Sequence, residues 1–458
     1  MIMNIPQKLS PNPWPICQRS ESGRITRSPF PPAREKRVTG ITFPGTGPRV
    51  LSILLAAFFL LFPCIFQPQA RAAENTDNSI RQLIQNGGYA VKTASDRLEG
   101  YNSDTPFIPA STIKLVTCLA ALEILGPDYR FDTRFFIDAD GNLFIKGAGD
   151  PMLTSEEVAV IARSLFEHGI RRVRAVILDG SAFALESMVD GAEDSARPYD
   201  AEITPLAVNF NALPIRVHAD HTLDSGEKQT PTLPLMREIG RSMAPGRYRV
   251  NVGAYPVRGE IPNESRYVGE LFISLLRQQG IETGDIILAG TVPKNASYVF
   301  SHTSDTLREI IRDCLEFSNN FIANELFLAC GRIRFGGPAT WEKGRRALAE
   351  FTSRRLHLPP ETITMVEGSG LSRKNRVTPR TMITVLEAFA PFTDLLPVKH
   401  DYLMKSGTLT GVYCYSGYLG GGRAPFSIML NQETNSRDQI LRLLTAQFMT
   451  PRSAEAQN

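Results

Sequence analysis

The sequence has few cysteines, histidines and tryptophans and almost no net charge. Among 458 residues there are six cysteines, six histidines and two tryptophans. Lys and Arg number 50 against 47 Asp and Glu, which leaves a net charge of only +3. No Cys and His spacing is typical of a zinc site, and no short repeat or low-complexity tract occurs. We therefore expect no metal, no cofactor and no nucleic-acid partner.

The small positive charge belongs to the first 72 residues, which hold nine Lys and Arg against two Glu. The rest of the chain is therefore near −4. Residues 51–66 form an uncharged apolar run, with Arg49 before it and Ala70-Arg71-Ala72 after it. This pattern predicts a signal peptide cut after Ala72, with an uncleaved N-terminal anchor as the open alternative. Residues 1–48 either form a disordered extension or precede the true start of translation.

Four cysteines follow this leader, and each lies in an apolar segment: Cys118, Cys314, Cys330 and Cys414. An oxidising compartment would allow three full pairings of four cysteines. Free cysteine packs as a small hydrophobe, so we expect buried thiols rather than disulfides. The only local His cluster, His218-Ala219-Asp220-His221, is too short a match for a metal site, and we expect a solvated loop there.

Three short polar motifs stand out from their surroundings. They are Ser111-Thr112-Ile113-Lys114, Ser318-Asn319-Asn320 and Lys405-Ser406-Gly407-Thr408. Each alone is weak evidence, because its residues are common. Together and in this order they match the S-x-x-K, S-x-N and K-[TS]-G set of enzymes that acylate a serine with D-Ala-D-Ala peptides or β-lactams.

The first motif predicts a nucleophile and its base. Residues three apart share a helix face, so Lys114 can reach the hydroxyl of Ser111. The residues after Lys114 are apolar nearly all round, which predicts a buried helix that ends at Gly126-Pro127. Ser111 then lies at or near the helix N-terminus, where the dipole favours negative charge. Burial lowers the pKa of a lysine, so Lys114 can take the proton of Ser111.

The second motif interrupts a helical pattern, because Ser and Asn favour turns and caps. A turn between two helices is one interpretation of this break. In the functional interpretation, Ser318 relays a proton while Asn320 contacts the substrate amide and positions Lys114.

The third motif lies in a predicted strand that starts at Tyr402 and continues into a hairpin. Lys405 offers a positive charge to a substrate carboxylate, and Ser406 offers a hydroxyl beside it. Gly407 is expected where another backbone or a ligand comes close. The N–H groups of Thr408 and Ser111 are predicted to form the oxyanion hole.

The chain resembles the class C low-molecular-mass penicillin-binding proteins, a family of D-alanyl-D-alanine carboxypeptidases and endopeptidases. Beyond the three motifs, the resemblance includes the glycine-rich segment Leu143–Pro151 and the loop Glu367–Arg373. It also includes Lys405–Val412 and Ser427–Asn431, and it covers roughly residues 80–448.

The family resemblance implies an α+β fold. Its serine β-lactamase/transpeptidase-like catalytic domain is an antiparallel sheet flanked by helices, split by a large inserted domain. A folded insertion is also required because Ser111 and Ser318 are far apart in the chain yet must share one cleft. In that insertion we predict strands at 143–146, 173–178 and 286–289 and helices at 155–167 and 267–279. The expected division is 1–72 for the N-terminal extension and signal peptide, 73–142 and 300–450 for the catalytic domain, 143–299 for the inserted domain and 451–458 for the tail.

The resemblance implies hydrolysis of the terminal D-Ala-D-Ala bond of peptidoglycan stem peptides through an acyl-enzyme on Ser111. Endopeptidase action on D-Ala–diaminopimelate cross-links is also implied, as is covalent inhibition by β-lactams. Peptidoglycan lies outside the cytoplasm, so we expect a periplasmic or extracytoplasmic protein. Membrane contact would come only from an uncleaved leader.

Three positions depart from the family pattern: Asn319 and Glu367 where Asp is common, and Ser406 where Thr is common. None removes a side chain that carries the chemistry. One alternative is a serine β-lactamase or esterase, which needs fast deacylation and in class A enzymes uses a dedicated glutamate. Glu367 is the only candidate for that role, and a loop-ordering role is favoured. A non-catalytic cell-wall binding protein is the other alternative, against which the intact motifs argue.

Overall fold

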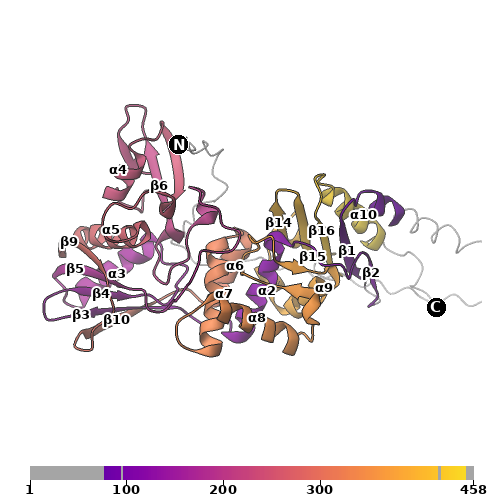
Figure 1. Cartoon of the computed structure of the whole chain (residues 1–458), viewed down its shortest axis with the longest axis horizontal. Coiled ribbons are helices and arrows are strands. Elements are labelled where there is room, and N and C mark those ends of the chain that lie inside the picture. Colours follow the sequence, from indigo (N-terminus) through magenta and orange to yellow (C-terminus); the bar gives the residue numbers. More distant parts are fainter. Residues whose placement is uncertain (1–76, 94–95, 421–423, 450–458) are drawn as a thin grey trace, which may run out of the picture. The chain divides into compact units, whose positions relative to one another are not determined.

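The computed structural model describes residues 77–93, 96–420 and 424–449. The predicted signal peptide, its cleavage after Ala72 and the tail at 451–458 lie outside these ranges. The described residues from Leu83 onward belong to one compact unit, whose elements are labelled in Figure 1. Within the described ranges, no helix is both long enough and apolar enough to cross a membrane.

A six-stranded antiparallel sheet contains the third motif. Its strand order is β13-β14-β15-β16-β1-β2. The bounds are β1 (Gly87–Lys92), β2 (Leu98–Tyr101), β13 (Val398–Lys399), β14 (Tyr402–Leu409), β15 (Val412–Leu419) and β16 (Ala424–Leu430). The predicted strand at Tyr402 and the hairpin after it are confirmed. Strand β1, from the other end of the chain, pairs with β16 and joins the two predicted parts of the catalytic domain in one sheet.

Two helices lie on opposite faces of this sheet. Helix α9 (Pro379–Phe389) packs against β16 and β1, and the Tyr418 hydroxyl donates to a carbonyl of α9. Helix α10 (Arg437–Met449) packs against β15 and β16, and the Tyr415 hydroxyl donates to a carboxylate of α10. Successive side chains of a strand point to opposite faces, so Tyr415 and Tyr418, three residues apart, point to opposite sides.

Helix α2 (Lys114–Ile124) lies at the centre of the larger apolar core. Its residues from Lys114 to Leu122 are all buried, which confirms the predicted buried helix. A short 3₁₀ turn, Ala110–Ile113, leads into it and carries Ser111. The helix stops as predicted at Gly126, whose φ of +90° no longer permits helical geometry.

The second motif separates two helices. Helix α6 (Leu307–Glu316) ends just before it, and α7 (Asn320–Phe335) begins inside it. Ser318 lies between them with a φ of +55°. The side chain of Asn319 caps α7 by accepting the N–H of Ile322, and either Asn or Asp can do this. The predicted break is confirmed, and α8 (Trp341–Arg354) packs along α7.

A five-stranded sheet, ordered β10-β3-β4-β5-β9, follows the first part of the catalytic core. Its bounds are β3 (Asp132–Ile137), β4 (Leu143–Lys146), β5 (Arg172–Asp179), β9 (Glu282–Ala289) and β10 (Ser297–Thr303). Helices α3 (Ser155–Glu167) and α5 (Asn263–Gln278) pack with this sheet (Figure 1). The strands and helices predicted for this stretch are therefore confirmed.

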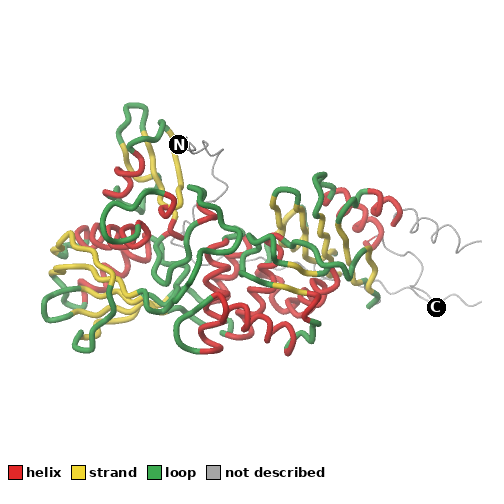
Figure 2. The backbone as a smooth tube through the Cα atoms, in the orientation of Figure 1, coloured by secondary structure: helices red, strands yellow, loops and turns green. Residues whose placement is uncertain are grey.

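Two smaller sheets complete the unit. One is β7-β6-β8 with helix α4 against it, and the other pairs β11 with β12. Their bounds are β6 (Ala212–Val217), β7 (Leu223–Ser225), β8 (Gly246–Asn251), α4 (Pro234–Gly240), β11 (Ile363–Thr364) and β12 (Arg376–Val377). The connection from β5 to β6 contains only 3₁₀ turns and runs mostly as loop (Figure 2).

Two clusters of buried apolar side chains divide the unit. One surrounds α2 and includes Phe131 and Leu307, and the other fills the five- and three-stranded sheets and includes Phe135. Phe300 packs against the second cluster. The chain therefore passes from the first core to the second between Phe131 and Phe135, and it returns to the first between Phe300 and Leu307. The division with an insertion at 143–299 stays a prediction, and β3 and the end of β10 share the sheet of that segment from outside these limits.

The four cysteines in the described ranges are free thiols, and all of them are buried, as predicted. Of the local His cluster, His218 is half-buried in the β6–β7 hairpin, with its Nε2 atom 2.9 Å from a carboxylate oxygen of Asp224. In the described ranges, no group of three or more His, Cys, Asp or Glu residues is arranged to hold a metal ion.

Candidate active site

Lys114 links the first two motifs. Its Nζ atom lies 3.1 Å from Oγ of Ser111, 2.8 Å from Oδ1 of Asn320 and 2.6 Å from the carbonyl oxygen of Ser369. The side chain has no exposed surface. Burial lowers its pKa to about 8, well below that of a lysine in water. A substantial fraction of Lys114 is therefore neutral near physiological pH, and its lone pair can accept a proton from Ser111.

The turn that carries Ser111 is held from two sides by glycines. A Cβ atom on Gly407 would lie 2.7 Å from the carbonyl oxygen of Pro109 and 2.9 Å from the backbone nitrogen of Ser111. On the other side, Gly370 has a φ of +87°, and a Cβ atom there would lie 2.1 Å from the carbonyl oxygen of Ala110. Both contacts are closer than any side chain permits. Only glycine at these positions lets β14 and the loop after Glu367 pack so closely against the turn that carries Ser111.

Lys405 and Ser318 form a second serine–lysine pair. Nζ of Lys405 lies 2.8 Å from Oγ of Ser318 and 3.0 Å from the carbonyl oxygen of Ser406. Lys405 also has no exposed surface. Burial first, and then the charges of Lys114 and Lys399, hold its pKa well below the usual lysine value. The structure thus contains two pairs of a serine hydroxyl and a lysine amine whose pKa is lowered.

Glu367 organises the loop that supplies the Ser369 carbonyl to Lys114. Its carboxylate is fully buried. It accepts hydrogen bonds from the backbone N–H groups of Ser369, Gly370 and Ser372, from the Ser369 hydroxyl and from the Asn375 side chain. Every bond of this carboxylate goes to its own loop. The geometry supports the loop-ordering role, and it leaves Glu367 no exposed oxygen with which to activate water.

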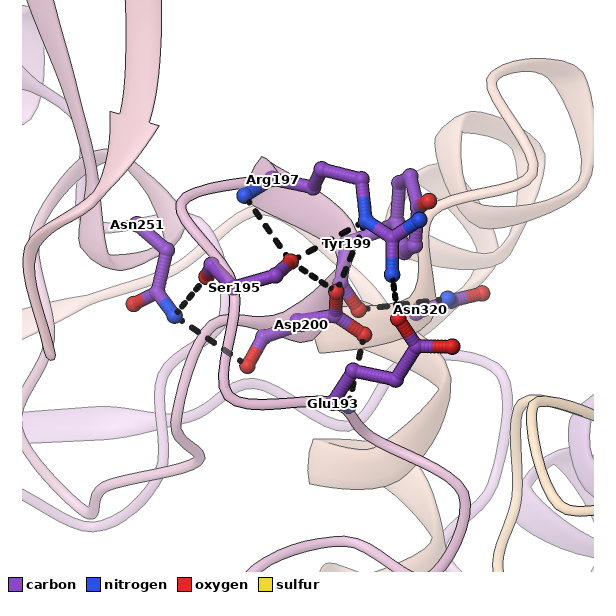
Figure 3. Close-up of polar contacts among 7 residues, drawn as sticks. All are labelled: Glu193, Ser195, Arg197, Tyr199, Asp200, Asn251 and Asn320. Carbon is purple, nitrogen blue, oxygen red and sulfur yellow. Dashed lines mark hydrogen bonds and ion pairs between the residues drawn. The ribbon is translucent and has the colours of Figure 1, made fainter. Parts of the chain in front are cut away.

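A segment before β6 contacts Asn320 of the second motif (Figure 3). The amide nitrogen of Asn320 lies 3.4 Å from the carbonyl oxygen of Tyr199. The guanidinium of Arg197 lies 4.7 Å from the centre of the Tyr199 ring and also pairs with the buried carboxylate of Asp200. Asp200 in turn accepts the Ser195 hydroxyl and the N–H of Glu193. This network fixes the segment beside Asn320.

The same segment is anchored at a second point. The carboxylate of Asp190 accepts the hydroxyl of Ser372 and pairs with Lys374, both in the loop after Glu367. Sequence reasoning missed this segment entirely. Its residues carry no motif spacing, and only a contact between distant parts of the chain brings Tyr199 to Asn320.

Two cations outside the motifs contact the third motif. Nζ of Lys399 lies 2.9 Å from Oγ of Ser406. Nη1 of Arg437 lies 2.8 Å from Oγ1 of Thr408 and 3.0 Å from the carbonyl oxygen of Gly407. Sequence reasoning missed both residues, because nothing in the order of the chain predicts which surface cations fold back onto β14.

The structure therefore brings all eight predicted site residues to one region: Ser111, Lys114, Ser318, Asn320, Lys405, Ser406, Gly407 and Thr408. Their individual roles stay predictions. The oxyanion role of the Thr408 N–H is among them.

Comparisons with known proteins agree with this geometry. The profile of the D-Ala-D-Ala carboxypeptidase 3 (S13) family matches residues 74–242 and 250–404. The D-alanyl-D-alanine carboxypeptidase of Actinomadura sp. strain R39 is 28% identical over 418 residues, which cover 75% of this chain and 77% of that protein. The D-alanyl-D-alanine carboxypeptidase DacB of Haemophilus influenzae is 25% identical over 399 residues, 74% of this chain and 83% of that one.

The solved structures extend the similarity to the fold. Penicillin-binding protein 4 (dacB) of H. influenzae superposes with a TM-score of 0.65 at 21% identity, over 79% of this chain and 94% of that one. The same protein has also been solved in complex with a β-lactam, and that structure superposes with a TM-score of 0.59 over 78% of this chain.

Proposed function

Because the chain belongs to the D-Ala-D-Ala carboxypeptidase 3 (S13) family, we propose that its two serine–lysine pairs carry out the peptidase reaction of that family. The predicted α+β, penicillin-binding-protein fold and the predicted D-Ala-D-Ala carboxypeptidase activity are confirmed by the family and its relatives. Ser111 and Lys114 form and hydrolyse the acyl-enzyme. Ser318 and Lys405 protonate the leaving group. This role replaces the carboxylate-binding role expected for Lys405 from the sequence, because its Nζ atom donates to Ser318.

Acylation begins at Ser111. Neutral Lys114, 3.1 Å away, takes the hydroxyl proton as Oγ attacks the scissile carbonyl carbon. The developing oxyanion is stabilised by backbone N–H groups, with those of Ser111 and Thr408 as the candidates. Lys114 donates hydrogen bonds to both Ser111 and Asn320, and the Asn320 side chain orients the substrate amide.

Collapse of the tetrahedral intermediate requires a proton on the leaving nitrogen. Ser318 supplies it and is recharged by Lys405, whose ammonium lies 2.8 Å from the serine oxygen. The C–N bond breaks, the D-amino acid leaves, and the acyl group remains as an ester on Ser111. Lys114 then gives up the proton it took, which returns through solvent to the now neutral Lys405. Neutral Lys114 takes a proton from the water that attacks the ester and passes it to Ser111 Oγ as the C–O bond breaks, so the serine is regenerated.

The substrates we assign are peptidoglycan stem peptides that end in D-Ala-D-Ala. D-Ala–diaminopimelate cross-links offer the same scissile bond chemistry, which makes endopeptidase action a second activity of the site. β-Lactams imitate the acyl donor and should acylate Ser111, as the β-lactam complex of the H. influenzae relative supports. A family that acts on the bacterial cell wall works outside the cytoplasm, and we propose that the leader at 1–72 exports this chain.

The observation that carries the proposal is the position of Lys114 Nζ between Ser111 Oγ and Asn320 Oδ1. The test is intact-mass spectrometry after incubation with penicillin. We expect one stable adduct on the peptide that contains Ser111, and none in Ser111→Ala. An adduct that persists in Ser111→Ala would refute the assignment, and rapid multiple-turnover hydrolysis of penicillin would favour a β-lactamase.

A further inference from the structure

The free edge of β14 has a cation at one end that belongs to none of the three motifs. Lys399 is the last residue of β13, which pairs with the start of β14 through a two-residue turn. The turn residues His400 and Asp401 have φ values of +50° and +67°, as tight hairpin turns require. The hairpin therefore fixes the backbone of Lys399 beside the strand that carries the third motif.

Beyond this short hairpin and the bond from the Met404 N–H to the Pro397 carbonyl, no described strand pairs with this edge of β14. In the described part of the chain, β13 pairs only with Tyr402 and Leu403, whereas β15 pairs with Leu403–Leu409 on the other side. The side chain of Lys399 reaches Ser406, farther along β14, with 2.9 Å between Nζ and Oγ. An extended substrate that lies along this edge would meet both groups.

Lys405 and Lys399 differ in their burial and in their hydrogen-bond partners. Lys405 is fully buried and donates to Ser318 and to the Ser406 carbonyl. Lys399 is half-buried, donates to the Ser406 hydroxyl and forms no ion pair with a carboxylate in the described ranges. Lys405 is thus committed to the proton-relay serine. Lys399 keeps two N–H groups for a ligand.

Positive charge exceeds negative charge around Ser406. The charge of Arg437 lowers the pKa of Lys399, and the charge of Lys399 lowers that of Lys405. Against these three cations, Glu316 is the carboxylate that raises the pKa of Lys399. Burial and the positive charge of Arg437 lower the pKa of Lys399, and Glu316 opposes them only in part. A half-buried ammonium in such a place is stabilised by an anion.

We propose that Lys399 is a specificity-determining residue that, together with Ser406, binds the free α-carboxylate of the leaving D-amino acid. The inference rests on the proposed function. Because Ser406 Oγ accepts its hydrogen bond from Lys399, the hydroxyl proton is free to point outward. One carboxylate oxygen then accepts from Ser406 and the other from Lys399. A peptide with a blocked C-terminus lacks the charge that this pair recognises.

The test compares two substrates in three enzymes. The substrates are a D-Ala-D-Ala peptide with a free C-terminal acid and the same peptide as a carboxamide. Lys399→Met should lower kcat/KM for the acid about 10- to 100-fold, the loss expected for one charge-assisted hydrogen bond. It should leave the carboxamide nearly unchanged. Lys399→Arg should restore most of the preference for the acid.

A matched control removes an exposed lysine far along the chain, in the loop before β10. Lys294→Met should leave kcat/KM unchanged for both substrates. If Lys399→Met does not fold, judged by its thermal midpoint, Lys399→Gln provides the second neutral variant. Equal losses for acid and carboxamide, or no loss in a folded neutral variant, would overturn the role of Lys399. A wild-type protein that neither cleaves the acid nor forms a penicillin adduct would overturn the proposed function as well.

Discussion

The rate at which Ser111 is acylated should depend steeply on pH between 7 and 9. The pKa of Lys114 is lowered to about 8 by burial, so about a tenth of the side chain is neutral at pH 7 and about nine tenths at pH 9. Only the neutral amine can accept the serine proton. The acylation rate constant by penicillin should therefore rise about tenfold over this range, with the midpoint near pH 8.

The assay is a quenched time course in which intact-mass spectrometry counts the Ser111 adduct at each pH. Penicillin must be fresh at each point, because its own hydrolysis at high pH would lower its concentration. Lys399→Arg is a useful comparison, since it keeps the local charge and leaves Lys114 untouched. A rate that is flat from pH 7 to 9 would show that Lys114 is not the base that limits acylation.

The same shift predicts an effect on stability that does not depend on activity. A lysine whose pKa is lower in the folded state binds fewer protons there than in the unfolded chain, so stability rises with pH above the folded pKa. Relative to Lys114→Met, the wild type should gain about 2 kcal/mol of unfolding free energy between pH 7 and 9.5. Urea unfolding of both proteins at the two pH values measures this difference. Parallel pH dependences would refute the low pKa.

Further substitutions test other parts of the site. Gly407→Ala should lower the acylation rate at least tenfold, because its Cβ would collide with the turn that carries Ser111, and penicillin labelling measures the loss. Glu367→Gln should cost about 2–4 kcal/mol in urea unfolding, because an amide can accept from fewer of the donors around it. Ser318→Ala should reduce kcat on the peptide about 100-fold or more, since the leaving nitrogen loses its proton donor. Glu325 is buried with both carboxylate oxygens unpartnered, and burial raises its pKa well above the usual value. The free energy of unfolding should therefore fall as pH rises above about 4.5. In urea unfolding, Glu325→Gln should be as stable as the wild type at pH 4.5 and more stable at pH 8.

The sequence predicted the parts of the site that depend on local spacing. Ser111 and Lys114 are three residues apart, where the 3₁₀ turn leads into α2, and this spacing places them on one face with 3.1 Å between Oγ and Nζ. The break at Ser318 and the strand at Lys405 follow from turn and strand preferences within a few residues. Their convergence on one cleft followed from the family resemblance, since no local rule joins residues so far apart in the chain.

The parts that could not be predicted depend on contacts between distant segments. The Tyr199 carbonyl reaches Asn320 from a loop with no secondary-structure pattern, held by the ion pair of Arg197 with buried Asp200. Asp200 looks like any surface carboxylate in the sequence, and only the fold shows that it is buried. The same is true of Lys399, whose role depends on a two-residue turn and on the length of one side chain.

The two serine–lysine pairs are coupled by charge, and in the proposed mechanism this coupling links proton uptake at one pair to proton release at the other. The charge of Lys114 lowers the pKa of Lys405. When Lys114 takes the proton of Ser111 it becomes positive, and Lys405 becomes a stronger acid at that moment. Lys405 then donates more readily to Ser318, and Ser318 to the leaving nitrogen. Acylation at one pair therefore promotes protonation at the other, and a neutral Lys114→Met variant would lose the base and leave Lys405 a weaker acid.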